Sequence, residues 1–122
     1  MLPAKPLPLG NDYLIRVYLT EFDADTNSYI PATGLVDVLA TFTRDAAGTT
    51  PIALDLTDIA LTELSVSADP DNEGWYSATV PAADLDADLN NVEYLNGLVY
   101  RVIRVGDPVE ATFVQPLRVV LP

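Results

Sequence analysis

Two long runs of β-favouring residues near the C-terminus constrain the fold more than any other feature of the chain. Leu98–Val105 and Val109–Val119 are rich in Val, Ile, Tyr, Phe and Thr, which favour a pleated, half-buried surface. Gly106, Asp107 and Pro108 between them form a strong turn signal, so the two runs predict a long β-hairpin. Because a hairpin is at best marginally stable alone in water, the rest of the chain must extend its sheet and cover it with a second layer.

Five shorter segments earlier in the chain predict the remaining strands. Each shows apolar–polar alternation or a short apolar run, and turns rich in Gly, Pro, Asp and Asn separate them. The segments are Tyr13–Thr20, Leu35–Thr43, Ile52–Leu56, Thr62–Ala68 and Trp75–Val80. About seven strands spaced in this way predict an all-β fold, an immunoglobulin-like antiparallel β-sandwich in which residues 11–122 form one domain.

Three segments receive more specific interpretations. Glu21–Gly34 is expected to form a polar loop. Pro81–Leu89 favours a helical turn because Pro and Asp lie early in it. In the strand Leu35–Thr43 the alternation separates a core face from an outward face. The core face is Val36, Val38, Ala40 and Phe42, and the outward face is Asp37, Thr41 and Thr43.

The composition excludes several classes of function. The chain has no Cys and no His, so disulfides, zinc–thiolate sites, Ser–His–Asp triads and Cys–His pairs are all excluded. No spacing singles out a catalytic pair among the 18 Asp and Glu residues, and we expect no enzyme activity and no cofactor. The net charge of −12 argues against nucleic acid as a partner, and no apolar run is long enough to span a membrane. The acidity either keeps the protein soluble or favours a basic surface or divalent cations.

Residues 1–10 predict an extended, proline-rich N-terminal arm. Three prolines within the first eight residues disfavour a helix or a central strand and favour polyproline II. The arm is apolar at Leu2, Leu7 and Leu9. Two arrangements remain open: the arm folds back on its own domain, or it lies on a neighbouring subunit and these leucines bind the partner.

One acidic turn has the spacing of a weak metal site. Asp69, Asp71 and Glu73 place oxygen donors at positions 1, 3 and 5 of a calcium-loop pattern, with Gly74 at position 6. Val80 stands at position 12, where a bidentate Glu is required, so an EF-hand is excluded. The three acids remain weak metal candidates, and the simpler interpretation is a turn whose carboxylates face water.

Arg101 and Arg104 fall on opposite faces of a regular strand. Either one of them points inward and needs an acidic partner, because burial of a lone charge is too costly, or a β-bulge intervenes between them. This pair favours a structural role over ligand binding.

The stretch Gly74–Pro81, followed by an Asp-rich link and Tyr94–Val102, resembles the small immunoglobulin-like domains of tailed-bacteriophage virion proteins. In those domains a Gly-x-Tyr strand precedes a final hairpin, and here the resemblance covers roughly Gly74–Val119. It implies a non-enzymatic structural protein, with a capsid decoration or cement role favoured over a head–tail or tail component. No binding residues carry over from the family.

This resemblance also implies where the protein acts and what it binds. The expected partners are other virion proteins, above all major capsid or tail subunits, reached through the arm and the sheet edges, and a homo-oligomer is a further option. Met1 is the only Met and no secretory signal follows it, so we expect a complete gene product made in the host cytoplasm and located in the virion.

The alternative function is a carbohydrate- or calcium-binding immunoglobulin-like adhesion module. Aromatic side chains would offer stacking faces to a sugar, and the acidic loops would hold the cation. The candidate stacking residues are Tyr13, Tyr18, Tyr29, Trp75 and Tyr94.

Overall fold

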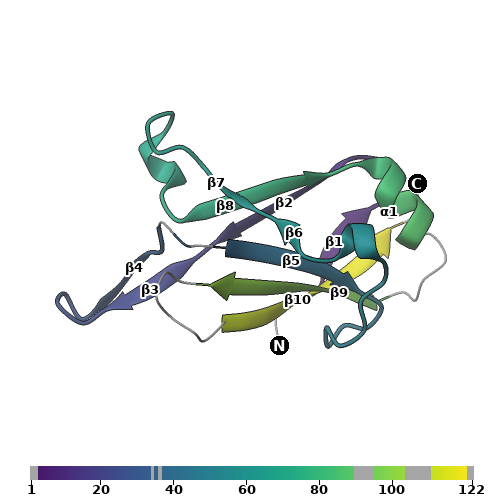
Figure 1. Ribbon diagram of the computed structural model, residues 1–122, viewed down its shortest axis with the longest axis horizontal. Helices are drawn as coiled ribbons and strands as arrows, with labels where there is room; N and C mark the ends of the chain where they lie inside the picture. Colours follow the sequence, from purple (N-terminus) through teal and green to yellow (C-terminus); the bar gives the residue numbers. More distant parts are fainter. Residues whose placement is uncertain (1–2, 34, 36, 90–94, 104–110, 121–122) are drawn as a thin grey trace.

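The chain folds into two β-sheets and a separate two-stranded ribbon. The computed structural model describes residues 3–33, 35, 37–89, 95–103 and 111–120. The larger sheet has five strands in the order β1 (Lys5–Pro8), β10 (Ala111–Val120), β9 (Leu95–Ile103), β5 (Asp37–Thr43) and β6 (Ile59–Ala60). The smaller has the order β2 (Tyr13–Tyr18), β8 (Trp75–Val80) and β7 (Thr62–Glu63), and the ribbon pairs β3 (Thr20–Asp23) with β4 (Ser28–Pro31). Figure 1 shows the two sheets as two layers, which confirms the all-β prediction.

The C-terminal hairpin is the centre of the larger sheet. β9 and β10 pair antiparallel from Ala111 opposite Val102 to Arg118 opposite Leu95. β5 then pairs with the other side of β9. The predicted pairing of the two long strands is confirmed, while the turn residues Gly106, Asp107 and Pro108 lie outside the described residues.

The core face of β5 agrees with its alternation. Val38 is 3% exposed, and Ala40 and Phe42 are fully buried. Val36 lies outside the described residues. Side chains from both sheets meet these residues in one continuous cluster, so the core lies between the layers.

The opposite face of β5 corrects one prediction. Thr41 and Thr43 were expected to face solvent, but they are only 7% and 1% exposed. The connections after β5 cover them, because the Thr43 hydroxyl donates to the Asp45 carbonyl and the Thr41 hydroxyl accepts from the Asp58 amide. The sequence pattern shows which way these side chains point but does not show that a loop lies over them.

The N-terminal arm folds onto its own domain. β1 is the edge strand of the larger sheet and runs parallel to β10, with Lys5 opposite Leu117 and Pro8 opposite Val120. An edge position suits a proline-containing strand, because the missing N–H groups need not pair. Leu7 is fully buried and Leu9 is 4% exposed.

This placement bears on the predicted partner-binding residues of the arm, whose role toward a partner stays a prediction. Leu7 and Leu9 are part of the chain's own core, so in this arrangement they offer no surface to a neighbour. The first of the two open arrangements is the one observed. Leu2, the third predicted partner-binding residue, lies outside the described residues.

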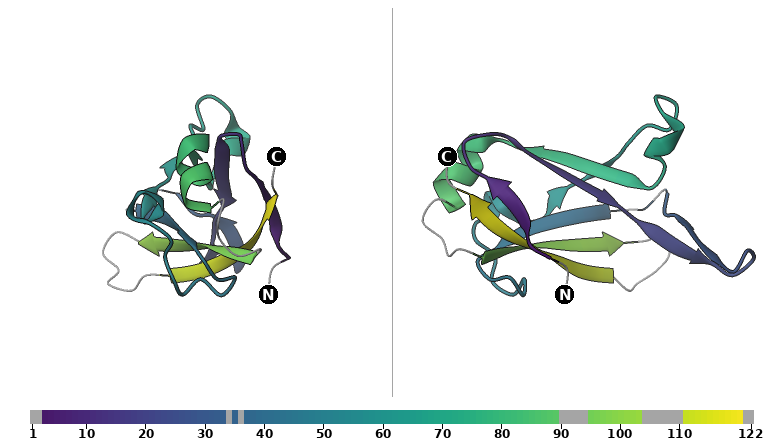
Figure 2. Two further views of the ribbon diagram at one scale, coloured as in Figure 1. Left: turned by 90° about the vertical axis from the view of Figure 1, so that its right-hand side faces the viewer. Right: turned by 180° about the vertical axis from the view of Figure 1, so that it is seen from behind.

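The helical segment closes one end of the sandwich. Helix α1 (Ala82–Leu89) fully buries Leu85 and Leu89, and Figure 2 shows it at the end opposite the ribbon. The Ala82 amide donates to Asp12 and the Gly10 amide donates to Asp86, so the helix is tied to the end of the arm. The predicted helical turn is thus a helix of eight residues.

Two of the predicted strands are wrong or too long. Ile52–Leu56 forms no strand and ends in the 3₁₀ turn η1 (Leu54–Leu56). The predicted strand Thr62–Ala68 is reduced to the two residues of β7, since turns begin soon afterwards and lead to a second 3₁₀ turn, η2 (Pro70–Asn72). Short apolar runs do not distinguish a strand from a compact turn.

Candidate functional site

The outer face of the smaller sheet carries large apolar side chains that are exposed among the residues that the structure describes. Along β2 the side chains alternate, so Ile15 points into the core while Leu14 and Tyr18 point outward. Leu14 is 55% exposed and Tyr18 is 44% exposed. Only Leu19 separates β2 from β3, and the alternation continues across it to Phe22, which is 51% exposed.

Two cross-strand aromatic pairs lie along this face. Tyr18 is opposite Trp75 with ring centroids 5.2 Å apart, and Phe22 is opposite Tyr29 in an edge-on arrangement at 5.5 Å. Pairs of this kind stabilise neighbouring strands by about 0.2–1 kcal/mol each. Together with Leu14, these four residues form what we call the aromatic face.

The distal part of the aromatic face stands away from the body of the protein. Figure 1 shows the β3–β4 ribbon projecting beyond both sheets, and Tyr29 on it is 76% exposed. The turn at its tip is held by local hydrogen bonds, because the Asp23 carboxylate accepts from the Asp25 amide and the Thr26 hydroxyl. Asn27 adopts a φ of 53°, a left-handed conformation that Asn tolerates. The polar-loop prediction for Glu21–Gly34 is therefore wrong over β3 and β4.

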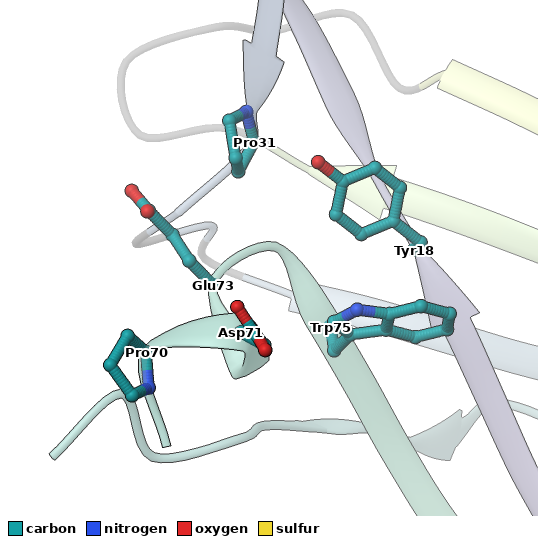
Figure 3. Close-up of a pocket in the computed structure, with 6 residues that line it drawn as sticks. All are labelled: Tyr18, Pro31, Pro70, Asp71, Glu73 and Trp75. Carbon is teal, nitrogen blue, oxygen red and sulfur yellow. The ribbon is translucent and has the colours of Figure 1, made fainter.

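A pocket of about 370 Å³ opens beside the Tyr18–Trp75 pair. In Figure 3 these two rings form one wall, and Glu73 and Pro70 lie across from them. The turn η2, the strands β2 and β8 and the end of β4 all contribute to it. We call this the Trp75 pocket, and its lining residues are Tyr18, Pro31, Pro70, Asp71, Glu73 and Trp75.

Gly74 permits the close approach that forms the pocket. Its φ is +84°, and a Cβ at this position would lie 2.9 Å from the Pro31 Cβ and 2.9 Å from the Tyr18 Cε1. The Leu19 amide donates to the Gly74 carbonyl at 2.9 Å, which joins the end of β2 to the turn before β8. A larger residue at position 74 would push this turn away from the ribbon.

The polar atoms of the pocket are available to a ligand. Within the described part of the chain, no hydrogen bond engages the carboxylates of Asp71 and Glu73. The Tyr18 hydroxyl and the Trp75 indole N–H likewise have no hydrogen-bond partner among the described residues. One neighbouring cation is already present, since the Arg16 guanidinium carbon lies 4.6 Å from the centroid of the Trp75 ring.

The three metal candidates do not act together. The Asp69 carboxylate accepts from the Asp71 amide at 3.0 Å and so holds the start of η2, while Asp71 and Glu73 line the pocket. Among the residues that the structure describes, no group of three or more His, Cys, Asp or Glu side chains could hold a metal ion.

The pKa shifts of three titratable groups have structural causes. The pKa of Asp45 is lowered by hydrogen bonds to its carboxylate. The largest contribution is from the Thr49 hydroxyl, and smaller ones come from the amides of Thr50 and Thr49. Burial raises the pKa of Tyr100, and burial also raises the pKa of Tyr76, whose hydroxyl donates to the Ala32 carbonyl. Asp45 thus holds a loop, while Tyr76 and Tyr100 lie in the core.

A second hollow, of about 250 Å³, lies over the outward side of β5 and β9. Arg101 lines it and forms an ion pair with Asp58 at 2.7 Å, with side-chain exposures of 33% and 47%. Arg101 therefore has an acidic partner, but the pair lies at the surface, where ion pairs contribute little stability. Arg104 lies outside the described residues.

Three of the five predicted stacking residues lie on the aromatic face, namely Tyr18, Tyr29 and Trp75. Tyr13 instead packs inward against Phe42, and Tyr94 lies outside the described residues. The sequence analysis missed Phe22. It lies five residues before Asn27, a residue type that tolerates left-handed backbone and is compatible with a hairpin turn. The sequence pattern did not indicate these strands, because β3 and β4 have only four residues each and are too short to show a clear alternation.

Comparison with protein-family models, with curated proteins and with solved structures found no match to this chain. No helix in the described ranges is long and apolar enough to cross a bilayer. The candidate site is therefore defined by its own geometry, which combines an exposed aromatic face with an acidic, aromatic-walled pocket.

Proposed function

We propose that the chain is an immunoglobulin-like domain acting as a non-enzymatic structural protein of a tailed-phage virion. The strand orders support the fold. The order β2–β8–β7 corresponds to strands B, E and D of an immunoglobulin domain, and β10–β9–β5 corresponds to strands G, F and C. The ribbon is then an insertion between strands B and C.

The observation that carries the proposed binding role is the aromatic face. Binding energy at protein interfaces concentrates in a few aromatic and Arg residues, and this face presents four aromatic side chains in two ordered pairs. Burial of the exposed parts of Phe22 and Tyr29, on the order of 100 Å² each, would contribute roughly 2–3 kcal/mol apiece at about 25 cal/mol per Å². The partner is a neighbouring virion protein, and a capsid decoration or cement role is the favoured form.

This mechanism replaces the arm with the ribbon as the main contact. Leu7 and Leu9 already stabilise the chain itself, whereas the ribbon projects with its aromatic side chains exposed. β2 offers a second contact because it is an edge strand of the smaller sheet in the described topology. Weak contacts of this kind become effective when many copies occupy one lattice.

The test is the protein content of particles purified by density gradient from cells that carry the gene. We expect the chain to be present at a fixed copy number, measured by quantitative mass spectrometry against the most abundant particle protein. The double variant Phe22→Thr/Tyr29→Thr should lower this copy number at least fivefold.

Leu54→Thr is the matched control, because Leu54 is 93% exposed but lies on η1, outside the aromatic face. It should leave the copy number unchanged. Absence of the wild-type chain from purified particles would refute the virion role. Full occupancy by the double variant would refute the aromatic face as the contact.

A further inference from the structure

We propose that the Trp75 pocket receives an arginine side chain projecting from the partner protein. This inference rests on the proposed function, since it assumes that the aromatic face meets another protein. It adds the chemistry by which that partner is recognised, which is a guanidinium group placed between an indole ring and two carboxylates.

The lining of the pocket matches the two surfaces of a guanidinium group. The planar faces of an arginine stack on aromatic rings, and its edge N–H groups donate to carboxylates. The pocket supplies aromatic rings from Tyr18 and Trp75 on one wall, and the carboxylates of Asp71 and Glu73 lie among its other lining groups. No hydrogen bond within the described residues engages either carboxylate, so both remain available to accept.

The structure already contains one contact of the proposed kind. Arg16 places its guanidinium 4.6 Å from the centroid of the Trp75 ring, within the range of a cation–π interaction. Arg16 is not among the residues that line the pocket. Trp75 therefore already contacts one cation on β2 and also lines the pocket.

Charge favours a basic partner over a neutral one. The chain carries a net charge of −12, which attracts a basic surface over distances comparable to the Debye length. The hydroxyl groups of a sugar could donate hydrogen bonds to Asp71 and Glu73 but would leave both negative charges unbalanced. A guanidinium balances one of these charges and hydrogen-bonds to the carboxylates.

Trp75 makes the proposal directly measurable because it is the only Trp in the chain. Its fluorescence can be followed while N-acetyl-arginine amide is added to the full-length protein. N-acetyl-citrulline amide serves as the neutral probe of nearly the same shape. We expect saturable quenching by the arginine probe, and at least fivefold weaker binding of the citrulline probe.

A charge-matched pair of variants tests the two carboxylates. Asp71→Asn/Glu73→Gln should weaken binding of the arginine probe roughly three- to tenfold. Asp25→Asn/Asp55→Asn removes the same net charge from exposed positions outside the pocket and should leave binding unchanged. Equal loss in both double variants would mean that only the general negative charge matters, and would overturn the proposal.

A methyl glycoside panel distinguishes the competing occupant. Saturable quenching by a glycoside, together with no preference for arginine over citrulline, would overturn the proposal in favour of a sugar site. The outcomes of this test can be distinguished from those of the test of the proposed function. If particles contain the wild-type chain and the Asp71→Asn/Glu73→Gln variant occupies them equally well, only the arginine contact is refuted. If the chain binds the arginine probe but is absent from particles, only the virion role is refuted.

Discussion

Leu7 and Leu9 of the N-terminal arm and Phe22 and Tyr29 of the β3–β4 ribbon are two pairs of large apolar side chains with opposite exposure. Leu7 and Leu9 on the arm are 0% and 4% exposed, whereas Phe22 and Tyr29 on the ribbon are 51% and 76% exposed. From sequence alone, the arm was expected either to fold back on its own domain or to lie on a neighbouring subunit, and the ribbon was expected to be a polar loop. The structure thus buries these leucines of the arm and exposes these aromatic side chains of the ribbon.

The reason lies in what each segment pairs with. β1 pairs with β10 at the edge of the larger sheet, and this register directs Leu7 into the core between the layers. β3 and β4 pair only with each other in the described topology and belong to neither of the two larger sheets. Burial thus depends on the surface that a segment reaches, and hydrophobicity alone does not decide it.

The largest predicted effect is on the arm. Leu7→Ala should lower the free energy of unfolding by about 2–5 kcal/mol, because it removes a fully buried side chain and leaves a cavity. Urea denaturation followed by Trp75 fluorescence measures the change. Leu54→Ala is the control at a 93% exposed leucine and should change stability by less than about 0.5 kcal/mol. Equal stability of Leu7→Ala and wild type would show that the arm is not part of the core in solution.

The core aromatic residues should make the body sensitive to alkaline pH. Burial raises the pKa of Tyr100, with a further contribution from Tyr13, so the folded state keeps a proton that the unfolded state loses above a pH of about 10. The stability contributed by this group is complete below that pH and falls as pH rises, by up to about 1.4 kcal/mol per pH unit. Tyr100→Phe should flatten this loss in denaturation curves recorded from pH 9 to 11. An unchanged slope would mean that Tyr100 is not buried as described.

The parts of the fold that alternation and turn signals define were predictable. The pairing of β9 with β10, the bounds of β8 at Trp75–Val80 and the core face of β5 all follow from local patterns. The arm and the cover over Thr43 depend on contacts between distant residues, which a single sequence does not encode in any local pattern. The Trp75 pocket is the clearest case, because it forms only when η2, β8 and the ends of β2 and β4 come together.

A smaller effect should follow from loosening the start of the arm. The Gln115 side-chain amide donates to the carbonyls of Pro3 and Pro116, both at 2.8 Å, and Gln115 is 7% exposed. Gln115→Met keeps the approximate shape but removes the donor, at an expected cost of about 0.5–1.5 kcal/mol. Hydrogen exchange of the Leu7 and Leu9 amides should rise in the same variant. Thr112→Val, at an exposed site on the same strand, is the control. Unaltered exchange at both leucines would mean that this contact does not hold the arm.

The smallest effect on stability is expected on the ribbon, where the effect on binding should be greatest. Phe22→Thr/Tyr29→Thr replaces two aromatic residues by β-branched residues that also favour strands, so the main loss is one cross-strand aromatic pair worth about 0.2–1 kcal/mol. Because the ribbon contributes little to the core, global unfolding in urea should shift by less than about 0.5 kcal/mol. A global loss as large as that of Leu7→Ala would place these rings in the stabilising core and remove the contrast between the two regions. A near-neutral result would mean that the two exposed aromatic rings contribute little to folding. Stability alone would then not explain why a projecting ribbon keeps two large apolar side chains exposed to solvent.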